Sequence, residues 1–290
     1  MTAQTVLVTG ATGKVGRHLV AGLLERGVGV RALVRRPIAA ALPGPVRIVQ
    51  GDLQSPESVA AAAEGADAAF LLWPWFSPEG AGDVVETLAD RVRHLVYLSA
   101  ARLQRREQGP VDGVWTDVER LIEDSGVAWT FLRAGGFAAN TLMWAGQIRT
   151  GDVVRIPHPA AARSLVHERD LAEVAMRVLV EGGPARRAFA LTGPEVLTQA
   201  EQVGAIADAI GRRLRVEEVS PAVAVRELEG VLGRDLAASS ISHLATLIDA
   251  PERVTDDFTR VTGRKARTFA VWAAEHADDF RHPSRRGSRR

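Results

Sequence analysis

Glycines and a lysine near the start of the chain have the composition of a phosphate-binding turn. The stretch TGATGKVG spaces its glycines as G-x-x-G-x-x-G, at Gly10, Gly13 and Gly16. A mononucleotide P-loop requires G-x-x-x-x-G-K-[ST], but here Val8 stands at the first glycine position and Val15 follows Lys14. The P-loop interpretation therefore fails. Either a dinucleotide site or a merely tight turn remains, and the flanking elements must decide between them.

Two arginines and an aspartate follow at positions that would select the nucleotide. Arg35 and Arg36 stand in LVRRP, about 20 residues after the glycines, where an NAD-preferring site places an acid for the ribose 2′-hydroxyl. Guanidinium groups instead suit a 2′-phosphate, which favours NADP(H) over NAD(H). The alternative is that Arg36 only ends a strand in solvent. Asp52 in QGDL either accepts a hydrogen bond from the adenine amino group or helps to cap the next helix.

Side chains able to move a proton are scattered along the chain. Ser99 can donate a hydrogen bond to a substrate carbonyl, or it can satisfy backbone groups at a strand end. His158 and His167 carry imidazoles, which suit proton transfer near neutral pH, although each also suits a structural or surface position. Glu119 can act as a general base if it is buried, whereas its charged helix favours a solvated or salt-bridged carboxylate. Tyr97, the only tyrosine, is expected in the core.

Tryptophans gather in segments beside the expected cofactor edge. Trp75 belongs to WPWF, and Trp115 and Trp144 fall in segments that the fold would bring near the same cleft. Such rings would suit a flat hydrophobic acceptor such as a quinone or polyketide. The alternative is a small core or a subunit interface, and the latter would allow a homodimer. Trp129 and Trp272 are expected in the core.

Strands and helices alternate along the first half of the chain. Short apolar runs rich in β-branched residues predict strands at 5–8, 28–34, 46–52, 67–72, 94–100 and 127–133. Helical spacing follows after Gly16, after Ser55, over 81–91 and over 115–124. This alternation predicts an α/β fold with a doubly wound parallel sheet. Its first strand-to-helix turn lies beside the switch point where dinucleotides bind, so TGATGKVG is predicted to hold a dinucleotide.

The second half predicts a smaller lobe on the substrate side. We expect residues 1–150 to form the nucleotide-binding domain and 151–280 to form the lobe, with 161–192 packing back onto the sheet. Asp170 is expected to cap the helix LAEVAMRVLV. The basic residues 281–290 lack aromatics and periodicity, which predicts a disordered solubilising tail.

Composition excludes several classes of protein. The 290 residues are 46% apolar and 24% charged, which is ordinary for a globular protein. No cysteine is present, so disulfides, thiolate metal sites and cysteine nucleophiles are excluded, and no metal site is expected. The net charge of +1 gives little reason to expect nucleic acid as a partner. Neither a signal peptide nor a long apolar run is seen, so no membrane partner and a cytoplasmic location are expected.

An ordered set of stretches resembles the NmrA-like, NAD(P)H-binding type of atypical short-chain dehydrogenase/reductase. The stretches are TGATGKVG, LVRRP, QGDL, VYLSA, VERLIEDSGVAWTFLRAGGF and VHERDLAEVA, and VTGRKARTFAVWAAEHADDF is similar to the C-terminal segment of bacterial members. The resemblance extends over residues 5–280. It implies an extended Rossmann sheet with a smaller C-terminal substrate-side lobe. It also implies either a reductase, such as a quinone reductase, or a non-catalytic redox sensor.

The resemblance also implies where each part of the dinucleotide would lie. The pyrophosphate would lie on Gly10, Ala11, Thr12, Gly13, Lys14, Val15 and Gly16. The 2′-phosphate would meet Arg35, with Arg36 beside it, and the adenine would lie near Asp52 and Leu53. The adenosine ribose and nicotinamide side would follow Leu72, Trp73 and Pro74. The nicotinamide ribose would lie near Ser99 and Ala100, and the nicotinamide would be framed by Ala134, Gly135 and Phe137.

One departure from ordinary short-chain dehydrogenases bears on the mechanism. Those enzymes use a Tyr whose pKa is lowered by a Lys four residues later on one helix face. The equivalent helix here offers Trp115 and Glu119, and neither can take these roles. Loss of this dyad is typical of NmrA-like members. An acceptor that is already electrophilic needs less proton transfer, and positioning over the nicotinamide can supply much of the rate.

The sequence therefore supports one leading hypothesis and two alternatives. The leading one is an NADPH-dependent oxidoreductase that reduces a small, flat, hydrophobic carbonyl, enone or quinone, in specialised metabolism. The first alternative is a non-catalytic, NADP-sensing regulatory protein. The second is a cyclase or isomerase that has kept the dinucleotide pocket of the fold without redox use.

Overall fold

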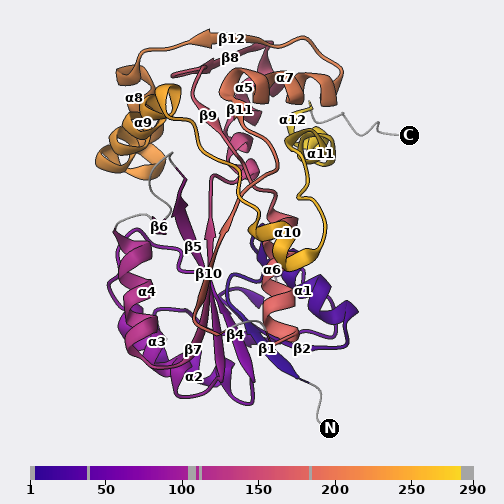
Figure 1. The fold of residues 1–290 in the computed structure, drawn as a ribbon, viewed down its shortest axis with the longest axis vertical. Helices are drawn as coiled ribbons and strands as arrows, with labels where there is room; N and C mark the ends of the chain where they lie inside the picture. Colours follow the sequence, from indigo (N-terminus) through magenta and orange to yellow (C-terminus); the bar gives the residue numbers. More distant parts are fainter. Residues whose placement is uncertain (1–3, 38–39, 104–108, 111–112, 183–184, 282–290) are drawn as a thin grey trace, which may run out of the picture.

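The computed structural model describes residues 4–37, 40–103, 109–110, 113–182 and 185–281. Figure 1 shows a parallel sheet flanked by helices in the lower part, and a smaller, mainly helical lobe above the sheet. The tail expected over 281–290 lies almost wholly outside the described residues.

One parallel sheet carries the first half of the chain. Its strands lie in the order β10-β7-β5-β4-β1-β2-β3, and every neighbouring pair in this order is parallel. Their bounds are β1 (Thr5–Val8), β2 (Gly29–Val34), β3 (Arg47–Gln50), β4 (Ala68–Leu71), β5 (His94–Arg102), β7 (Ala128–Ala134) and β10 (Arg187–Leu191). The strand order reverses between β1 and β4, which creates a switch point beside the end of β1. The predicted doubly wound sheet is confirmed.

Helices cover both faces of this sheet. One face carries α1 (Gly16–Glu25) and α6 (Glu168–Val180), and the other carries α2 (Pro56–Ala63), α3 (Ala81–Ala89) and α4 (Val114–Asp124), as Figure 1 shows. Strand β1 illustrates the reason, because its side chains alternate between the faces. Val6 and Val8 pack in the apolar cluster with α1 and α6, whereas Leu7 packs in the cluster with the other three helices. Both faces of the sheet are therefore buried under helices, as is usual for a parallel sheet.

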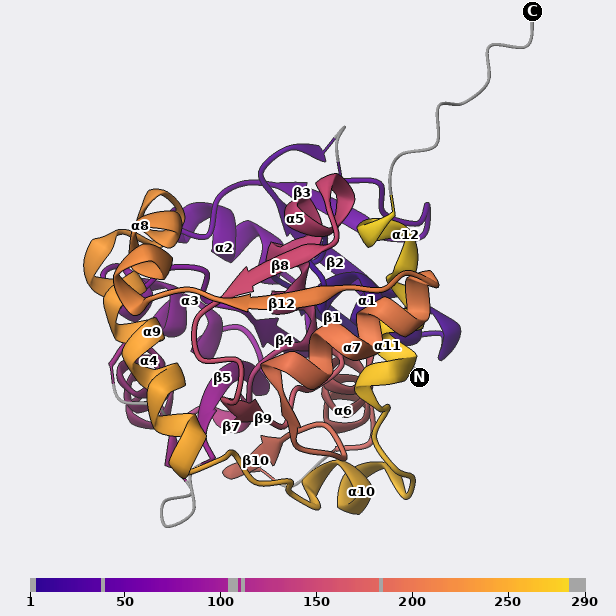
Figure 2. The same cartoon turned by 90° about the horizontal axis from the view of Figure 1, so that it is seen from above.

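The smaller lobe is built on two short strand pairs. β8 (Val153–Ile156) pairs in parallel with β12 (Arg215–Glu218), and β9 (Ala162–Arg163) pairs in antiparallel with β11 (Leu197–Thr198). The helices are the 3-10 helix η2 (Ala138–Trp144), α5 (Ala145–Thr150), α7 (Gln199–Ile210), α8 (Pro221–Leu232), α9 (Arg234–Asp249), α10 (Asp257–Thr262), α11 (Phe269–Glu275) and α12 (Ala277–Phe280). Figure 2 shows β8 and β12 crossing the top of the molecule, between α8 and α9 on one side and α7, α11 and α12 on the other. Within the described ranges, every helix is too short or too polar to cross a membrane.

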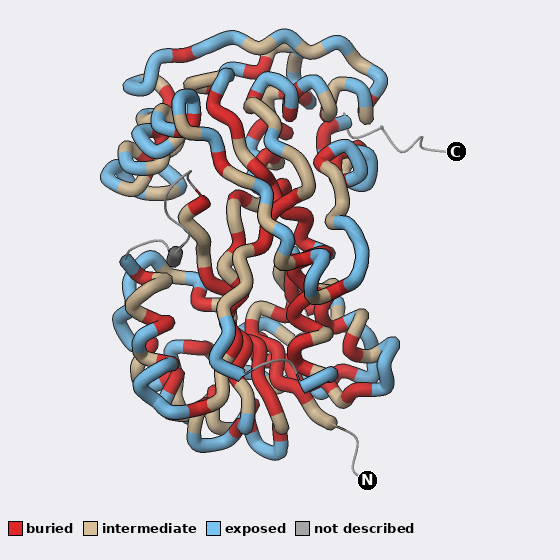
Figure 3. Tube along the Cα trace, viewed as in Figure 1, coloured by how far each residue is buried: buried red, intermediate tan, exposed pale blue. Residues whose placement is uncertain are grey.

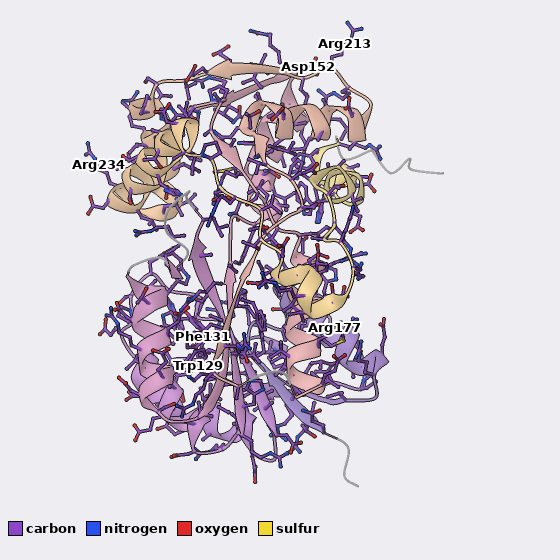
Figure 4. The ribbon with its side chains drawn as sticks, viewed as in Figure 1. Trp129, Phe131, Asp152, Arg177, Arg213 and Arg234 are labelled. Atoms are coloured by element: carbon purple, nitrogen blue, oxygen red, sulfur yellow. The ribbon has the colours of Figure 1, made fainter. Side chains whose placement is uncertain are left out.

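Buried residues follow the strands and the inner sides of the helices (Figure 3). Tyr97 is fully buried in β5, and Trp272 is fully buried in α11, so both expectations of a core position are confirmed. Trp129 is only half-buried and stacks on Phe131 of the same strand, with ring centroids 3.9 Å apart (Figure 4). The core expectation for Trp129 is therefore only partly met. β7 lies near the edge of the sheet, since only β10 lies beyond it.

The start of α6 corrects one expectation. Asp170 does not cap this helix, because the helix begins earlier, at Glu168. The cap is His167, whose Nδ1 accepts a hydrogen bond from the backbone N–H of Arg169 at 3.1 Å. The fully buried carboxylate of Asp170 instead accepts hydrogen bonds from the backbone N–H and the guanidinium of Arg267. This ion pair joins α6 to the segment just before α11.

Candidate functional site

The glycine turn lies between β1 and α1, as the sequence predicts. Gly10 has a φ of +63°, in the left-handed region that favours glycine, and its carbonyl accepts a 2.9 Å hydrogen bond from the N–H of Gly13. A Cβ at Gly16 would lie 2.1 Å from the carbonyl oxygen of Gly10, so only a glycine lets α1 start this close to the turn. No side chain caps α1, which leaves the positive end of its dipole open to an anion.

A cavity of about 550 Å³ opens beside this turn at the carboxyl ends of the parallel strands. Its walls include Gly10 and Thr12 of the turn, Arg35 and Arg36 after β2, Asp52 and Leu53 after β3, and Leu72, Pro74 and Trp75 after β4. The structure thus brings together residues that the sequence predicts for one dinucleotide from four separate segments. We refer to this space as the nucleotide cavity.

The polar groups of the nucleotide cavity fit a nucleotide that carries an extra phosphate. Arg35 and Arg36 are both exposed, and neither forms an ion pair with an acidic residue in the described part of the chain. Asp52 accepts a 3.0 Å hydrogen bond from the N–H of Gln54, whereas the cap of α2 is Ser55. Ser55 therefore caps α2, and of the two roles left open for Asp52 only the contact with adenine remains.

The two tryptophans of WPWF lie elsewhere than expected. Trp75 was expected at the substrate, but it lines the nucleotide cavity. Trp73 was expected along the cofactor, but it is buried beneath Trp75, with ring centroids 4.7 Å apart, and its Nε1 donates to the carbonyl of Ser77 at 2.8 Å. Both rings lie beyond the end of β4, and the hydrogen bond to Ser77 holds the Trp73 ring inward, so only the Trp75 ring faces the cavity.

Residues expected around the nicotinamide lie deeper than the sequence predicts. Ser99 and Ala100 lie within β5, as in the strand predicted over 94–100, and β5 continues to Arg102, where the short strand β6 (Gly109–Pro110) pairs with it. Their partners across the sheet are Arg133 and Ala134 of β7. Ser99 is buried, and its Oγ has no hydrogen-bond partner among the described residues. Ala134 is buried as well.

The glycines after β7 make room for other side chains. A Cβ at Gly135 would lie 2.6 Å from Cδ1 of Leu103, and one at Gly136 would lie 2.5 Å from Cζ of Arg163. The next residue, Phe137, forms a bridge with Val166 and lines a second cavity rather than the nucleotide cavity. The AGGF segment therefore carries the chain from the sheet into the lobe.

The second cavity, also of about 550 Å³, lies beneath α8 and α9, and we refer to it as the apolar cavity. Rings and aliphatic side chains make most of its wall, among them Phe76, Phe137, Met143, Trp144, Leu228 and Leu244. Of the three tryptophans expected at the substrate, Trp144 lines this cavity. Trp115, in the first turn of α4, does not line this cavity but packs against the apolar cluster on that face of the sheet, with its ring edge-on to Phe76 at a centroid distance of 6.2 Å.

Sequence reasoning did not find the helix pair that covers the apolar cavity. Residues 221–249 were predicted only as part of the C-terminal lobe, and the available signal was a pair of amphipathic helical segments. The position of the Lys14 side chain was not predicted either, because Lys14 was expected along the pyrophosphate. Its Nζ donates to the carbonyl of Ala139 at 2.9 Å, so the side chain runs from the glycine turn to the wall of the apolar cavity.

The candidate acid–base groups do not meet in either cavity. His158 lies in the loop after β8 with a φ of +49°, and its carbonyl accepts a hydrogen bond from Gln199. His167 is buried as the cap of α6. Burial, and then the nearby Glu119, raise the pKa of the Tyr97 hydroxyl, so this phenol stays protonated. Within the described ranges, no group of three or more His, Asp or Glu side chains is placed to hold a metal ion.

Glu119 is buried and forms a salt bridge with two hydrogen bonds. Its oxygens accept from Nε and Nη2 of Arg133 at 3.0 and 2.7 Å, and the exposed fractions of the two side chains are 4% and 22%. Both oxygens of the carboxylate are therefore engaged by one guanidinium. This geometry favours the salt-bridged alternative over a general base.

We expect a Glu119→Gln substitution to lower the free energy of unfolding rather than kcat. The amide would leave Arg133 without a counter-charge, which costs about 3 kcal/mol of unfolding free energy for a largely buried pair. Urea denaturation would measure this loss. The matched control is Asp117→Asn on the same helix, where the partly exposed pair with Arg120 contributes about 0.5 kcal/mol. A large fall in kcat with unchanged stability would instead identify Glu119 as a general base.

Comparison with known proteins identifies similar sequences and structures that bind NAD(P)H or are named as reductases. A model for a family described as NAD(P)H-binding matches residues 10–181, which is more than half of the chain. A (4-alkanoyl-5-oxo-2,5-dihydrofuran-3-yl)methyl phosphate reductase of Streptomyces griseus is 37% identical over 95% of this chain and 99% of its own length. An NAD(P)H azoreductase of Xenophilus azovorans is 31% identical over 95% and 99%. The NADPH-dependent quinone oxidoreductase of Escherichia coli, solved with NADPH, has a similar fold, with a TM-score of 0.78 at 20% identity over 93% of this chain and 99% of that one.

Proposed function

The chain belongs to the NAD(P)H-binding family as an NAD(P)H-dependent oxidoreductase, and from this premise we propose that it is an NADPH-dependent reductase of a flat, hydrophobic enone, quinone or related carbonyl compound. The observation that carries the proposal is that two cavities flank one glycine turn. Gly10 and Thr12 line the nucleotide cavity, whereas Lys14 of the same turn lines the apolar cavity. A dinucleotide and an apolar acceptor would therefore bind side by side.

The choice of NADPH rests on the charge of the nucleotide cavity. Arg35 and Arg36 reach it from the end of β2, and no acidic residue stands at that strand end to accept from a ribose 2′-hydroxyl. We propose that Arg35 binds the 2′-phosphate, that Asp52 accepts from the adenine amino group, and that the glycine turn holds the pyrophosphate. Each of these roles uses a group that the cavity already presents.

The residues of the apolar cavity would position the acceptor rather than exchange protons with it. NADPH supplies a hydride when it is bound, and a conjugated acceptor can receive it without prior protonation. Phe76 and Phe137 offer ring surfaces against which a flat acceptor can stack. The proton that completes the reduction can come from solvent. Fixing the two reactants in one geometry can supply much of the rate.

The names of the two relatives support a conjugated acceptor. One relative is named for an oxo-dihydrofuran with an alkanoyl group, and the other for reduction of azo compounds. The first name describes a ring that carries two carbonyl groups, and the second describes an N=N bond. We propose a conjugated acceptor here, within specialised metabolism. The cytoplasmic location and the homodimer expected from the sequence stay predictions.

The test combines nucleotide binding with turnover. Fluorescence titration is expected to give tighter binding of NADPH than of NADH, and an acceptor panel of quinones and enones is expected to consume NADPH. Tight NADPH binding without turnover of any acceptor would favour the sensor instead. Binding of neither nucleotide would contradict the assignment altogether.

A charge placed in the apolar cavity is expected to separate acceptor binding from nucleotide binding. Met143 lines this cavity and is 56% exposed, so a Met143→Glu substitution should fold and should raise the acceptor KM by about tenfold, since the carboxylate must be desolvated. Val231→Glu on α8 is the matched control, because Val231 is 84% exposed and does not line the cavity. An equal effect of both substitutions would place the acceptor elsewhere.

A further inference from the structure

The apolar cavity carries basic side chains on its wall but no acidic ones among the described residues. The basic residues that line it are Lys14, Arg163 and His243. The rest of the wall is mostly apolar, with uncharged polar side chains such as Asn140 and Gln202, so within the described ranges no carboxylate that lines the cavity offsets these positive charges. We propose that the acceptor bears an anionic group, such as a phosphate, sulfonate or carboxylate, which Lys14 and Arg163 hold. This inference rests on the proposed function only in treating the apolar cavity as the acceptor site.

The ammonium group of Lys14 has hydrogen-bond donors that the described residues do not use. Its ammonium group carries three N–H donors, and one of them is used by the carbonyl of Ala139. That hydrogen bond, at 2.9 Å, fixes the direction of a side chain that is otherwise exposed. No acidic residue in the described part of the chain forms an ion pair with it. Its charge is therefore available to an anion in the cavity.

Arg163 is fixed by an ion pair that uses only one edge of its guanidinium group. Its Nε and Nη2 donate to Oε1 of Glu252 at 2.9 and 2.7 Å, and Oε2 of the same carboxylate accepts from the N–H of Ser164 at 3.0 Å. Among the described residues, Nη1 has no hydrogen-bond partner. A planar guanidinium fixed along one edge presents its remaining donors in a defined direction, which suits an oxyanion.

Both cations are anchored to the same short segment after β7. The guanidinium of Arg163 packs over Gly136, where a Cβ would lie 2.5 Å from Cζ, and the ammonium of Lys14 binds the carbonyl of Ala139. Between these two positions lies Phe137, which lines the same cavity. The segment therefore presents an aromatic ring flanked by two positive groups. A flat acceptor with a charged substituent would match both kinds of surface at once.

The alternative role for Lys14 is a contact with the nucleotide pyrophosphate, and the two roles predict different results. A nucleotide contact would change NADPH affinity and leave the discrimination between charged and neutral acceptors unchanged. A contact with the acceptor anion would change that discrimination even when the nucleotide is saturating. The measurement must therefore be made with NADP⁺ already bound.

The experiment compares two probes of similar shape that cannot accept a hydride. Calorimetry on the NADP⁺-saturated protein would measure 2-naphthalenesulfonate against the neutral 2-naphthalenemethanol at constant ionic strength. We expect the sulfonate to bind at least about tenfold more tightly, as charge-assisted hydrogen bonds would provide. Lys14→Met should bring the ratio of the two affinities to about one. Arg163→Lys keeps a charge for Glu252 but loses the planar fork, so it should lower the ratio in part.

The matched control is Arg17→Met, which removes one positive charge from the same end of α1 but from a residue that does not line the cavity. It should keep the ratio of the wild type. Equal affinities of the two probes, equal ratios in Lys14→Met and Arg17→Met, or binding of neither probe would overturn the inference. Because the probes are inert, a lack of turnover would count against the proposed reductase and not against the anion site.

Discussion

Replacing Arg35 by Asp is expected to reverse the nucleotide preference from NADPH to NADH. A charge-assisted hydrogen bond to a phosphate contributes about 1.5–3 kcal/mol, and the new carboxylate would also repel the 2′-phosphate, so NADPH affinity should fall by about 100-fold or more. The same carboxylate would accept a hydrogen bond from the ribose 2′-hydroxyl of NADH, whose affinity should rise. Fluorescence titration with both nucleotides would measure the two changes.

Two further variants make this result specific. Arg36→Asp changes the neighbouring guanidinium and would report which arginine carries the contact. Arg213→Asp makes the same change in charge at the far end of the lobe (Figure 4) and should leave both affinities as they are. If Arg35→Asp keeps the preference of the wild type, the 2′-phosphate has been assigned to the wrong residue.

Gly16→Ala is expected to lower both the stability of the protein and its affinity for NADPH, because it distorts the turn beside the nucleotide cavity. The new Cβ would lie 2.1 Å from the carbonyl oxygen of Gly10 and 2.8 Å from Cα of Ala11, and both are backbone atoms that can move only if the turn opens. Overpacking of this kind costs about 3 kcal/mol of unfolding free energy. The displaced turn should also lose its phosphate contacts, so NADPH affinity should fall by about 100-fold or more.

A graded series of glycine substitutions supplies the control. At Gly13 the Cβ would lie 3.1 Å from the same oxygen, so Gly13→Ala should have a smaller effect in the same direction. Gly204 in α7 has no atom within 4 Å of its Cβ position, and alanine there should stabilise the helix by about 1 kcal/mol. Thermal unfolding and NADPH titration of the three variants would test the order. Wild-type NADPH affinity in Gly16→Ala would contradict the role given to the turn.

The nucleotide half of the site could be predicted because its signals are local and its geometry follows from topology. Each predicted segment combines a strand with the few residues after it, and parallel strands bring those ends to one edge. Arg35, Asp52 and Leu72 meet in one cavity for this reason, although they are far apart in the sequence. The order of strands and helices was therefore sufficient, and no side-chain contact had to be known.

The remaining features depend on contacts that no local pattern encodes. β5 runs two residues beyond its predicted end because Ala101 and Arg102 pair with a two-residue strand, β6, which has no apolar pattern of its own. Asp170 has the position of a helix cap in the sequence, yet its carboxylate is used by Arg267, 97 residues later. The apolar cavity exists because α8 and α9 fold over Phe137 and Trp144, which amphipathic spacing alone cannot specify.

The pairing of Asp170 with Arg267 also bears on how the chain is made. During synthesis the acid leaves the ribosome long before its partner, and a buried carboxylate without a counter-charge costs several kcal/mol. Until residue 267 has emerged, α6 cannot settle on the sheet with its full stability. The nucleotide-binding half is therefore not finished when its own residues have been translated, because one of its buried ion pairs is completed by a residue 97 positions further along.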